Sequence, residues 1–269
     1  MPNLMVRDRC NGNDRREAVP EGREEMNTRF LSAALIAAAL GASAQEPPLP
    51  DVKRTEILAF YTKRAEAATA GIMGTPDAGR LLSQRGDARL FLGDFKEAVA
   101  DFERMIALDP AEDAPHWRLG IAYHFAGDFA KSARQFEKYH AHDGRDRENG
   151  IWKFLADAKV VGIEKARAQM LPYTRFDREP FPSLYEMFAG RKTTDEVFAE
   201  IAEKKLGENG AVMFFAHYYG GLNETLLGHP DRARELLAKA VASPWGQSAE
   251  GGPAYMWQAA RLHYEALAK

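Results

Sequence analysis

The chain has 269 residues, with 36 Lys and Arg against 39 Asp and Glu, so its formal net charge at pH 7 is −3. This balance excludes the strongly basic surface that a nucleic-acid-binding protein needs, and we expect no nucleic-acid partner. The single cysteine, Cys10, excludes an internal disulfide and a metal site built from several thiolates.

Residues 26–44 have the three parts of a secretory signal peptide. Arg29 supplies a positive charge, and residues 30–40 form an apolar run. This run is shorter than the roughly 20 residues that span a bilayer. We therefore expect export to the periplasm or the medium, with no integral membrane segment in the mature chain. The predicted cleavage site consists of Ala42, Ala44 and Gln45.

Residues 1–25 are charged and show no apolar pattern. We interpret them as an upstream extension that is not translated, with Met26 as the true start. If they are translated, the signal is internal, and a cytosolic protein becomes the alternative. Residues 45–51 form a proline-rich linker, which argues against a continuing helix, and residues 52–269 form a single helical domain.

Two neighbouring segments repeat with a spacing of 34 residues. Gly93-Asp94-Phe95 recurs as Gly127-Asp128-Phe129. The spacing and the glycine–aromatic pattern resemble the tetratricopeptide repeat (TPR), in which two amphipathic helices form one unit. The residues that we expect to maintain the repeat structure are Gly86, Gly93, Phe102, Pro110, Gly120, Gly127, Phe136, Gly221 and Gly228.

The chemistry of these positions suits paired helices. Gly93 and Gly127 can end the first helix of a pair with positive φ, and Asp94 and Asp128 can cap the second. The fold class that we predict is all-α, a right-handed α-solenoid of TPR helix pairs with a helical insert and capping helices. The repeats lie near 79–112, 113–146, 149–173 and 211–243, the insert at 174–209, and the C-terminal capping helix at 253–268.

The order of motifs from the third unit onward is similar to the bacterial new-lipoprotein-I type of periplasmic TPR adaptor, over roughly residues 80–265. The motifs are Trp-Lys-Phe-Leu-Ala at 152–156, Glu-Lys-Ala at 164–166, Phe-Ala-Gly at 188–190 and Phe-Phe-Ala-His-Tyr-Tyr-Gly-Gly at 214–221. The resemblance implies a helical, often dimeric adaptor that brings envelope proteases to cell-wall hydrolases. That family is lipid-anchored, whereas no cysteine follows the predicted cleavage site here, so anchoring is not implied.

One face of the first helix in each pair carries aromatic residues where a face exposed only to water would be polar. Aromatic side chains with a polar edge are favoured binding anchors, so we expect a groove for an apolar peptide or a protein helix. The alternative is that these residues pack against the insert or the N-terminal helix. The predicted groove residues are Phe91, Trp117, Ile121, His124, Phe125, Phe215, Tyr218 and Tyr219.

Other polar segments have simpler interpretations. Residues 145–150 are predicted to form a solvated turn, with a specificity loop as the alternative, and residues 175–180 a charged linker. Thr193 or Thr194 is expected to cap a helix over residues 195–205.

His140 and His142 are weak metal-site candidates, because helical residues two apart face different directions. We therefore predict no enzyme activity, no cofactor and no metal, but an exported adaptor or scaffold for protein or peptide partners, possibly a homodimer. The alternatives are a structural scaffold of an envelope assembly and a metal-dependent hydrolase that uses the two histidines.

Overall fold

The computed structural model describes residues 47–72, 75 and 78–267. All described residues belong to one compact unit, which spans residues 45–269. The predicted upstream extension, the signal peptide and its cleavage site lie outside the described residues.

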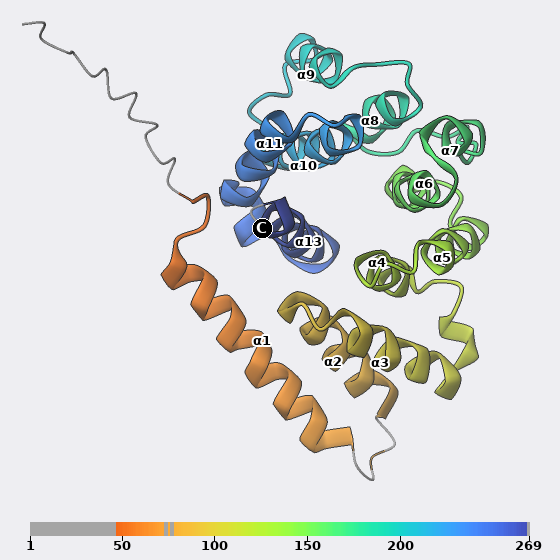
Figure 1. The fold of residues 1–269 in the computed structure, drawn as a ribbon, viewed down its shortest axis with the longest axis vertical. Helices are drawn as coiled ribbons and strands as arrows, with labels where there is room; N and C mark the ends of the chain where they lie inside the picture. The colour runs from red at the N-terminus through yellow and green to blue at the C-terminus, as the bar shows by residue number, and fades with distance from the viewer. Residues whose placement is uncertain (1–46, 73–74, 76–77, 268–269) are drawn as a thin grey trace, which may run out of the picture. The chain divides into compact units, whose positions relative to one another are not determined.

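The described part of the chain contains helices and no strand, which confirms the all-α prediction (Figure 1). None of these helices is both long enough and apolar enough to cross a membrane. The helices are α1 (Asp51–Ile72), α2 (Ala78–Leu92), α3 (Phe95–Leu108), the 3-10 helix η1 (Pro110–Glu112), α4 (Trp117–Phe125), α5 (Phe129–His142), α6 (Arg147–Val161), α7 (Ile163–Ala168), α8 (Phe181–Phe188), α9 (Thr194–Glu203), α10 (Gly210–Leu227), α11 (Pro230–Ala242), α12 (Pro244–Ser248) and α13 (Gly251–Leu267).

Successive helices pack as pairs, with α2 against α3, α4 against α5 and α10 against α11. In each pair, a glycine of the first helix faces a large side chain of the second. A Cβ atom at Gly86 would lie 2.6 Å from Cε1 of Phe102, and one at Gly120 would lie 2.8 Å from Cε2 of Phe136. The 34-residue spacing therefore reflects a repeated close contact between helices.

The turns between paired helices also need glycine. Gly93 has φ +94° and Gly127 has φ +82°, a region that favours glycine. Asp128 accepts a hydrogen bond from Lys131 N at 3.3 Å, as an N-cap residue does. Asp94 makes no side-chain capping bond, so the prediction of a carboxylate cap was wrong there, even though α3 begins at the expected place.

Two predictions about local structure have different outcomes. Thr193 caps α9, and its capping box with Glu196 is complete. The solvated turn predicted over residues 145–150 is wrong, because α6 begins at Arg147 and Gly150 is buried. Asp146 caps α6 by accepting a hydrogen bond from Glu148 N at 3.0 Å. Asn149 and Gly150 therefore lie inside the helix and do not form a turn.

The last helix, α13, does more than cap the end of the domain. It packs on α11 and α12 and also contacts α2, and Figure 1 shows it inside the curve of α2, α4, α6 and α10. Eight consecutive residues from Tyr255 to Leu262 are buried. The helix therefore occupies much of the face on which we predicted a groove.

Candidate functional site

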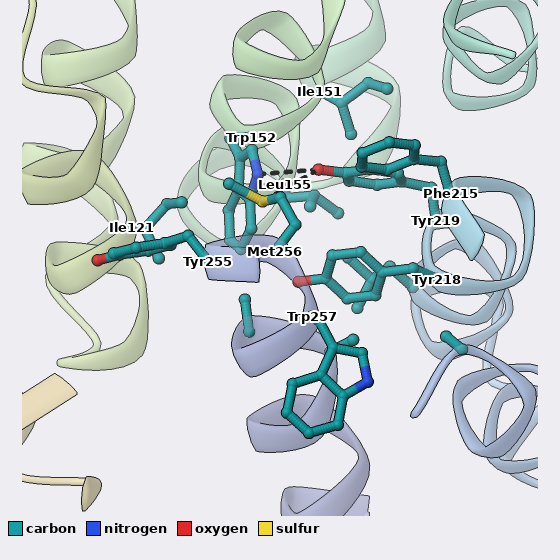
Figure 2. Packing of buried hydrophobic residues seen from close by; sticks show 14 of the residues in the cluster. Ile121, Ile151, Trp152, Leu155, Phe215, Tyr218, Tyr219, Tyr255, Met256 and Trp257 are labelled. Carbon is teal, nitrogen blue, oxygen red and sulfur yellow. Dashed lines mark hydrogen bonds between the residues drawn. The ribbon is translucent and has the colours of Figure 1, made fainter. Parts of the chain in front are cut away.

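Side chains of α13 contact the aromatic layer on the inner sides of the earlier helices. The ring of Tyr255 lies 4.7 Å from that of Phe91 and 4.9 Å from that of Trp117, between centroids. The imidazole of His263 lies 4.6 Å from the ring of Phe125. Figure 2 shows side chains of α13 approaching those of α4, α6 and α10. This packing favours the alternative interpretation of the aromatic face, to which α13 adds a third partner. The ring of Tyr61 in the N-terminal helix lies 5.0 Å from that of Phe91, and the ring of Phe181 in the insert lies 5.0 Å from that of Phe215, between centroids.

Five of the eight predicted groove residues are buried, namely Phe91, Ile121, Phe215, Tyr218 and Tyr219. Trp117, His124 and Phe125 are partly exposed. His124 and Phe125 pack against His263, and the Tyr218 hydroxyl lies 3.1 Å from Nδ1 of the same histidine. These three contacts place part of the predicted groove beneath α13.

Two pockets that share Trp117 in their lining open on the inner face. We call them the α6 pocket and the α2 pocket; Trp117 and Gly252 line both. The α6 pocket has a volume of about 280 Å³ and is lined by Trp117, Ile121, Asp146, Glu148, Asn149, Trp152, Arg178, Phe215, Gly252, Pro253 and Met256. The α2 pocket has a volume of about 510 Å³ and is lined by Tyr61, Arg64, Asp87, Phe91, Trp117, Arg118, Gly251, Gly252, Ala254 and Tyr255.

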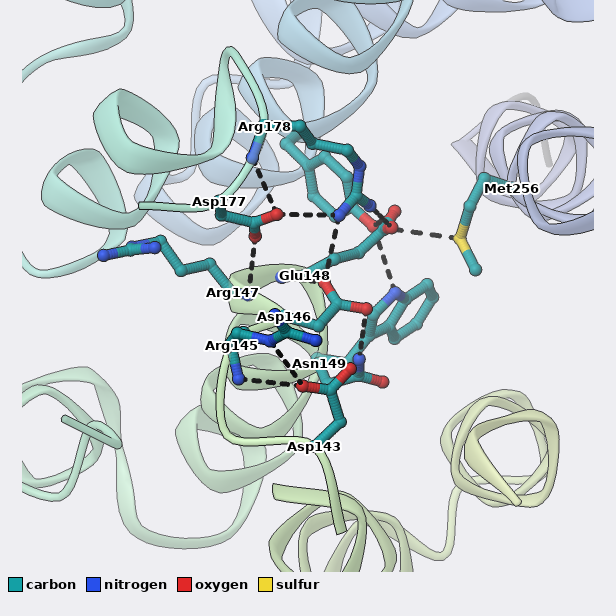
Figure 3. Close-up of polar contacts among 11 residues, drawn as sticks. Asp143, Arg145, Asp146, Arg147, Glu148, Asn149, Asp177, Arg178 and Met256 are labelled. Carbon is teal, nitrogen blue, oxygen red and sulfur yellow. Dashed lines mark hydrogen bonds and ion pairs between the residues drawn. The ribbon is translucent and has the colours of Figure 1, made fainter. Parts of the chain in front are cut away.

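A network of charged side chains forms one wall of the α6 pocket (Figure 3). Arg178 donates from Nη2 to Glu148 Oε2 at 2.5 Å and from Nη1 to Asp146 Oδ1 at 3.3 Å. Its guanidinium also lies 4.1 Å from the centroid of the Phe181 ring. Asp177 accepts from Arg147 N at 2.9 Å. The network thus joins the start of α6 to the segment before α8.

Glu148 is the most perturbed carboxyl group of this network. Burial raises its pKa to about 7, repulsion from Asp146 acts in the same direction, and attraction to Arg178 opposes both. Its other oxygen, Oε1, accepts a hydrogen bond from the Tyr219 hydroxyl at 2.6 Å. Because both carboxyl oxygens already have partners, Glu148 fits a structural role better than that of a free base.

Sequence analysis missed this network, because it assigned residues 145–150 and 175–180 to separate polar segments. Arg178 and Glu148 are 30 residues apart, and neither segment alone predicts the contact. The local signal that was available is Asp146, a favourable N-cap residue directly before a helical pattern. This signal would have predicted that Glu148 lies in the first helical turn of α6 and not in a solvated loop.

The α2 pocket contains a different polar arrangement. Arg118 donates from Nη1 to Asp87 Oδ2 at 2.7 Å and from Nη2 to Ser83 Oγ at 2.9 Å. Asp87 Oδ1 and the Tyr255 hydroxyl are buried and have no hydrogen-bond partner. Burial raises the pKa of Asp87 to about 6, while Arg118 lowers it. This pocket therefore has polar atoms that its own lining does not satisfy.

The two histidines considered as metal ligands lie apart from both pockets. The His140 ring packs against Tyr173, with centroids 4.9 Å apart, and the His142 ring lies 6.0 Å from that of Tyr139. Within residues 47–267, so far as they are described, no group of three or more His, Cys, Asp or Glu side chains could hold a metal ion. The hydrolase alternative gains no support from this part of the chain.

A comparison of the chain with protein-family models found no match. The resemblance to TPR adaptors therefore depends on the motifs quoted above and on the paired helices. The functional interpretation depends on the two pockets.

Proposed function

We propose that this chain is an exported, non-catalytic adaptor or scaffold that binds a protein or peptide partner at the two pockets beside Trp117. In this proposal the helix pairs form a right-handed α-solenoid of the TPR type. The observation that carries the proposal is the composition of the open inner face. It combines aromatic walls with charged edges, and such surfaces are typical of protein-binding sites.

The repeated close contacts between helices support the solenoid part of the proposal. Gly86, Gly120 and Gly221 each face a bulky residue of the next helix at 2.6 to 2.8 Å from a hypothetical Cβ atom. Helix pairs of this kind bury their apolar faces only by stacking on neighbours, which creates a continuous inner surface. The two pockets beside Trp117 open on that surface next to α13.

A crosslinking capture from bacterial envelope extract tests the proposal. The bait is the purified chain, compared with Trp117→Ala and with Leu108→Ala. Leu108 is 57% exposed at the end of α3 and lines neither pocket. We expect proteins captured by the unmodified chain and by Leu108→Ala to be lost with Trp117→Ala. Equal capture by all three chains would contradict the proposed binding face, provided that urea unfolding shows Trp117→Ala to be folded.

Export and self-association are separate parts of the proposal. The mass of the chain recovered from cells tests export, which predicts a product that begins at Gln45.

The resemblance implies dimerisation through terminal helices, and α1 exposes Val52 and Phe60 at 73% and 57%. Light scattering on the purified chain and on Phe60→Asp tests the dimer; a monomer in both cases would contradict it.

A further inference from the structure

The α2 pocket contains two buried polar atoms that lack a partner, and they come from different helices. Oδ1 of Asp87 belongs to α2, and the hydroxyl of Tyr255 belongs to α13. Tyr255 is 7% exposed. Buried polar groups without partners are uncommon in native proteins, and each one calls for an explanation such as a bound ligand or water.

The two atoms differ in what they can bind. An ionised Asp87 accepts hydrogen bonds and cannot donate, and its second oxygen already accepts from Arg118. The Tyr255 hydroxyl can donate to an acceptor. A group that presents a donor to Asp87 and an acceptor to Tyr255 therefore satisfies both atoms. A peptide group has this combination, with its N–H and C=O held rigidly together.

The surroundings of these atoms favour a polypeptide over a small polar molecule. The rings of Phe91 and Trp117 lie against Tyr255 on two sides and form apolar walls. Gly252, which lines the pocket, is exposed, and a Cβ atom there would meet nothing within 4 Å, so this residue does not obstruct the pocket. The pocket also adjoins the α6 pocket across Trp117, and its volume of about 510 Å³ exceeds that of a single side chain.

The charges that line the pocket restrict the sequence of the ligand. Arg64 and Arg118 contribute +2 and Asp87 contributes −1, which gives +1 for the lining. Arg64 of α1 lines the pocket and is exposed. This balance disfavours a basic segment and favours an acidic or neutral one.

We propose that the α2 pocket binds an extended peptide segment through its main chain. The side chains of Asp87 and Tyr255, whose unpartnered atoms are buried in the free chain, turn into the pocket on binding, so that one N–H donates to Asp87 and one C=O accepts from Tyr255. An apolar side chain of the segment packs against Trp117 and Phe91, and acidic residues lie toward Arg64. The inference rests on the proposed function, because it names the kind of partner that the binding face takes.

The test is a titration with acetyl-Ala-Leu-Ala-amide, followed through the indole N–H signals of the purified full chain by NMR. The Trp117 signal is identified by its absence in Trp117→Phe. We expect this signal to shift along one saturable binding curve. Tyr255→Phe, which keeps the ring and removes only the hydroxyl, should weaken binding roughly tenfold, about the effect of one lost hydrogen bond.

Tyr173→Phe is the matched control, because the Tyr173 hydroxyl is also buried and unpartnered but lies outside the α2 pocket. This variant should bind the peptide as the unmodified chain does. If Tyr255→Phe also binds equally well, or if no peptide shifts the Trp117 signal, the proposal is wrong. A water molecule held between Asp87 and Tyr255 would produce that result.

A second titration tests the preference for an acidic segment over a basic one. Acetyl-Ala-Leu-Glu-amide should bind more tightly than acetyl-Ala-Leu-Lys-amide, and Arg64→Ala should reduce the difference. Equal affinities would overturn the assignment of Arg64. If protein capture depends on Trp117 but not on Tyr255, this inference fails while the proposed function stands. If capture does not depend on Trp117, the proposed function itself fails.

Discussion

Gly120 has no side chain, and the ring of Phe136 occupies the space that a Cβ atom would need. We predict that Gly120→Ala lowers the free energy of unfolding by about 1–3 kcal/mol, because overpacking outweighs the helix propensity gained. Gly252→Ala is the control, since its Cβ would meet nothing within 4 Å, and it should be neutral or slightly stabilising. Urea unfolding of both variants checks this. A loss that is equal in the two variants would contradict the close-contact interpretation.

A second prediction at the residue scale concerns Glu148, whose pKa burial raises to about 7. Between its usual pKa near 4.5 and about 7, the folded chain holds a proton that the unfolded chain releases. The contribution of this group to stability is therefore present at low pH and is lost as pH rises through that window, by up to about 1.4 kcal/mol per pH unit. Glu148→Gln cannot titrate, and its amide oxygen can still accept from Tyr219.

Urea unfolding between pH 5 and 7.5 checks this prediction. Relative to Glu148→Gln, the unmodified chain should lose stability as pH rises. Parallel pH profiles for the two proteins would show that Glu148 does not titrate in this range.

At the scale of elements, α13 and α1 differ in how much of each is buried. Eight residues of α13 are buried, whereas Ala68 is the one buried residue of α1. Arg261 of α13 also donates to Phe91 O at 2.6 Å. We predict that deletion of residues 251–269 abolishes cooperative unfolding and increases binding of an apolar dye. Deletion of residues 51–72 should leave a cooperative transition at lower urea concentration. If deletion of residues 251–269 kept a cooperative transition and deletion of residues 51–72 abolished it, the role of α13 as part of the core would be contradicted.

The sequence predicts some of these elements well and others poorly, for physical reasons. The α2–α3 and α4–α5 pairs follow from a repeated glycine and aromatic spacing, because each close helix contact needs the same residues at the same places. The position of α13 could not be predicted in this way. Its buried run from Tyr255 to Leu262 includes Gln258 and Arg261, so no apolar stripe indicates which face packs where. The contact between Arg178 and Glu148 depends on tertiary structure alone.

At the scale of the whole molecule, four buried or partly buried histidines connect the stability of the fold to the solution pH. Burial lowers the pKa of His116, His217 and His263 to about 4, and that of His124 to about 3. The folded chain therefore keeps these rings neutral, whereas the unfolded chain binds protons below about pH 6.5. The stability that neutral histidines provide is present above pH 6.5 and is lost as pH falls toward 4. The pKa of Glu148 is raised by burial, so its contribution to stability changes with pH in the opposite direction. Single substitutions therefore separate the contribution of Glu148 from those of the histidines.

His124 is the most informative position, because its Nδ1 is buried without a partner and its ring lies 5.9 Å from that of His263 under α13. We predict that His124→Phe loses less stability than the unmodified chain between pH 6.5 and 4.5, by up to about 1.4 kcal/mol per pH unit. His142→Asn is the control, since His142 is exposed, and it should follow the unmodified chain. Urea unfolding across this range measures the difference. Identical acid sensitivity in all three proteins would mean that burial in the folded chain does not hold the His124 ring neutral.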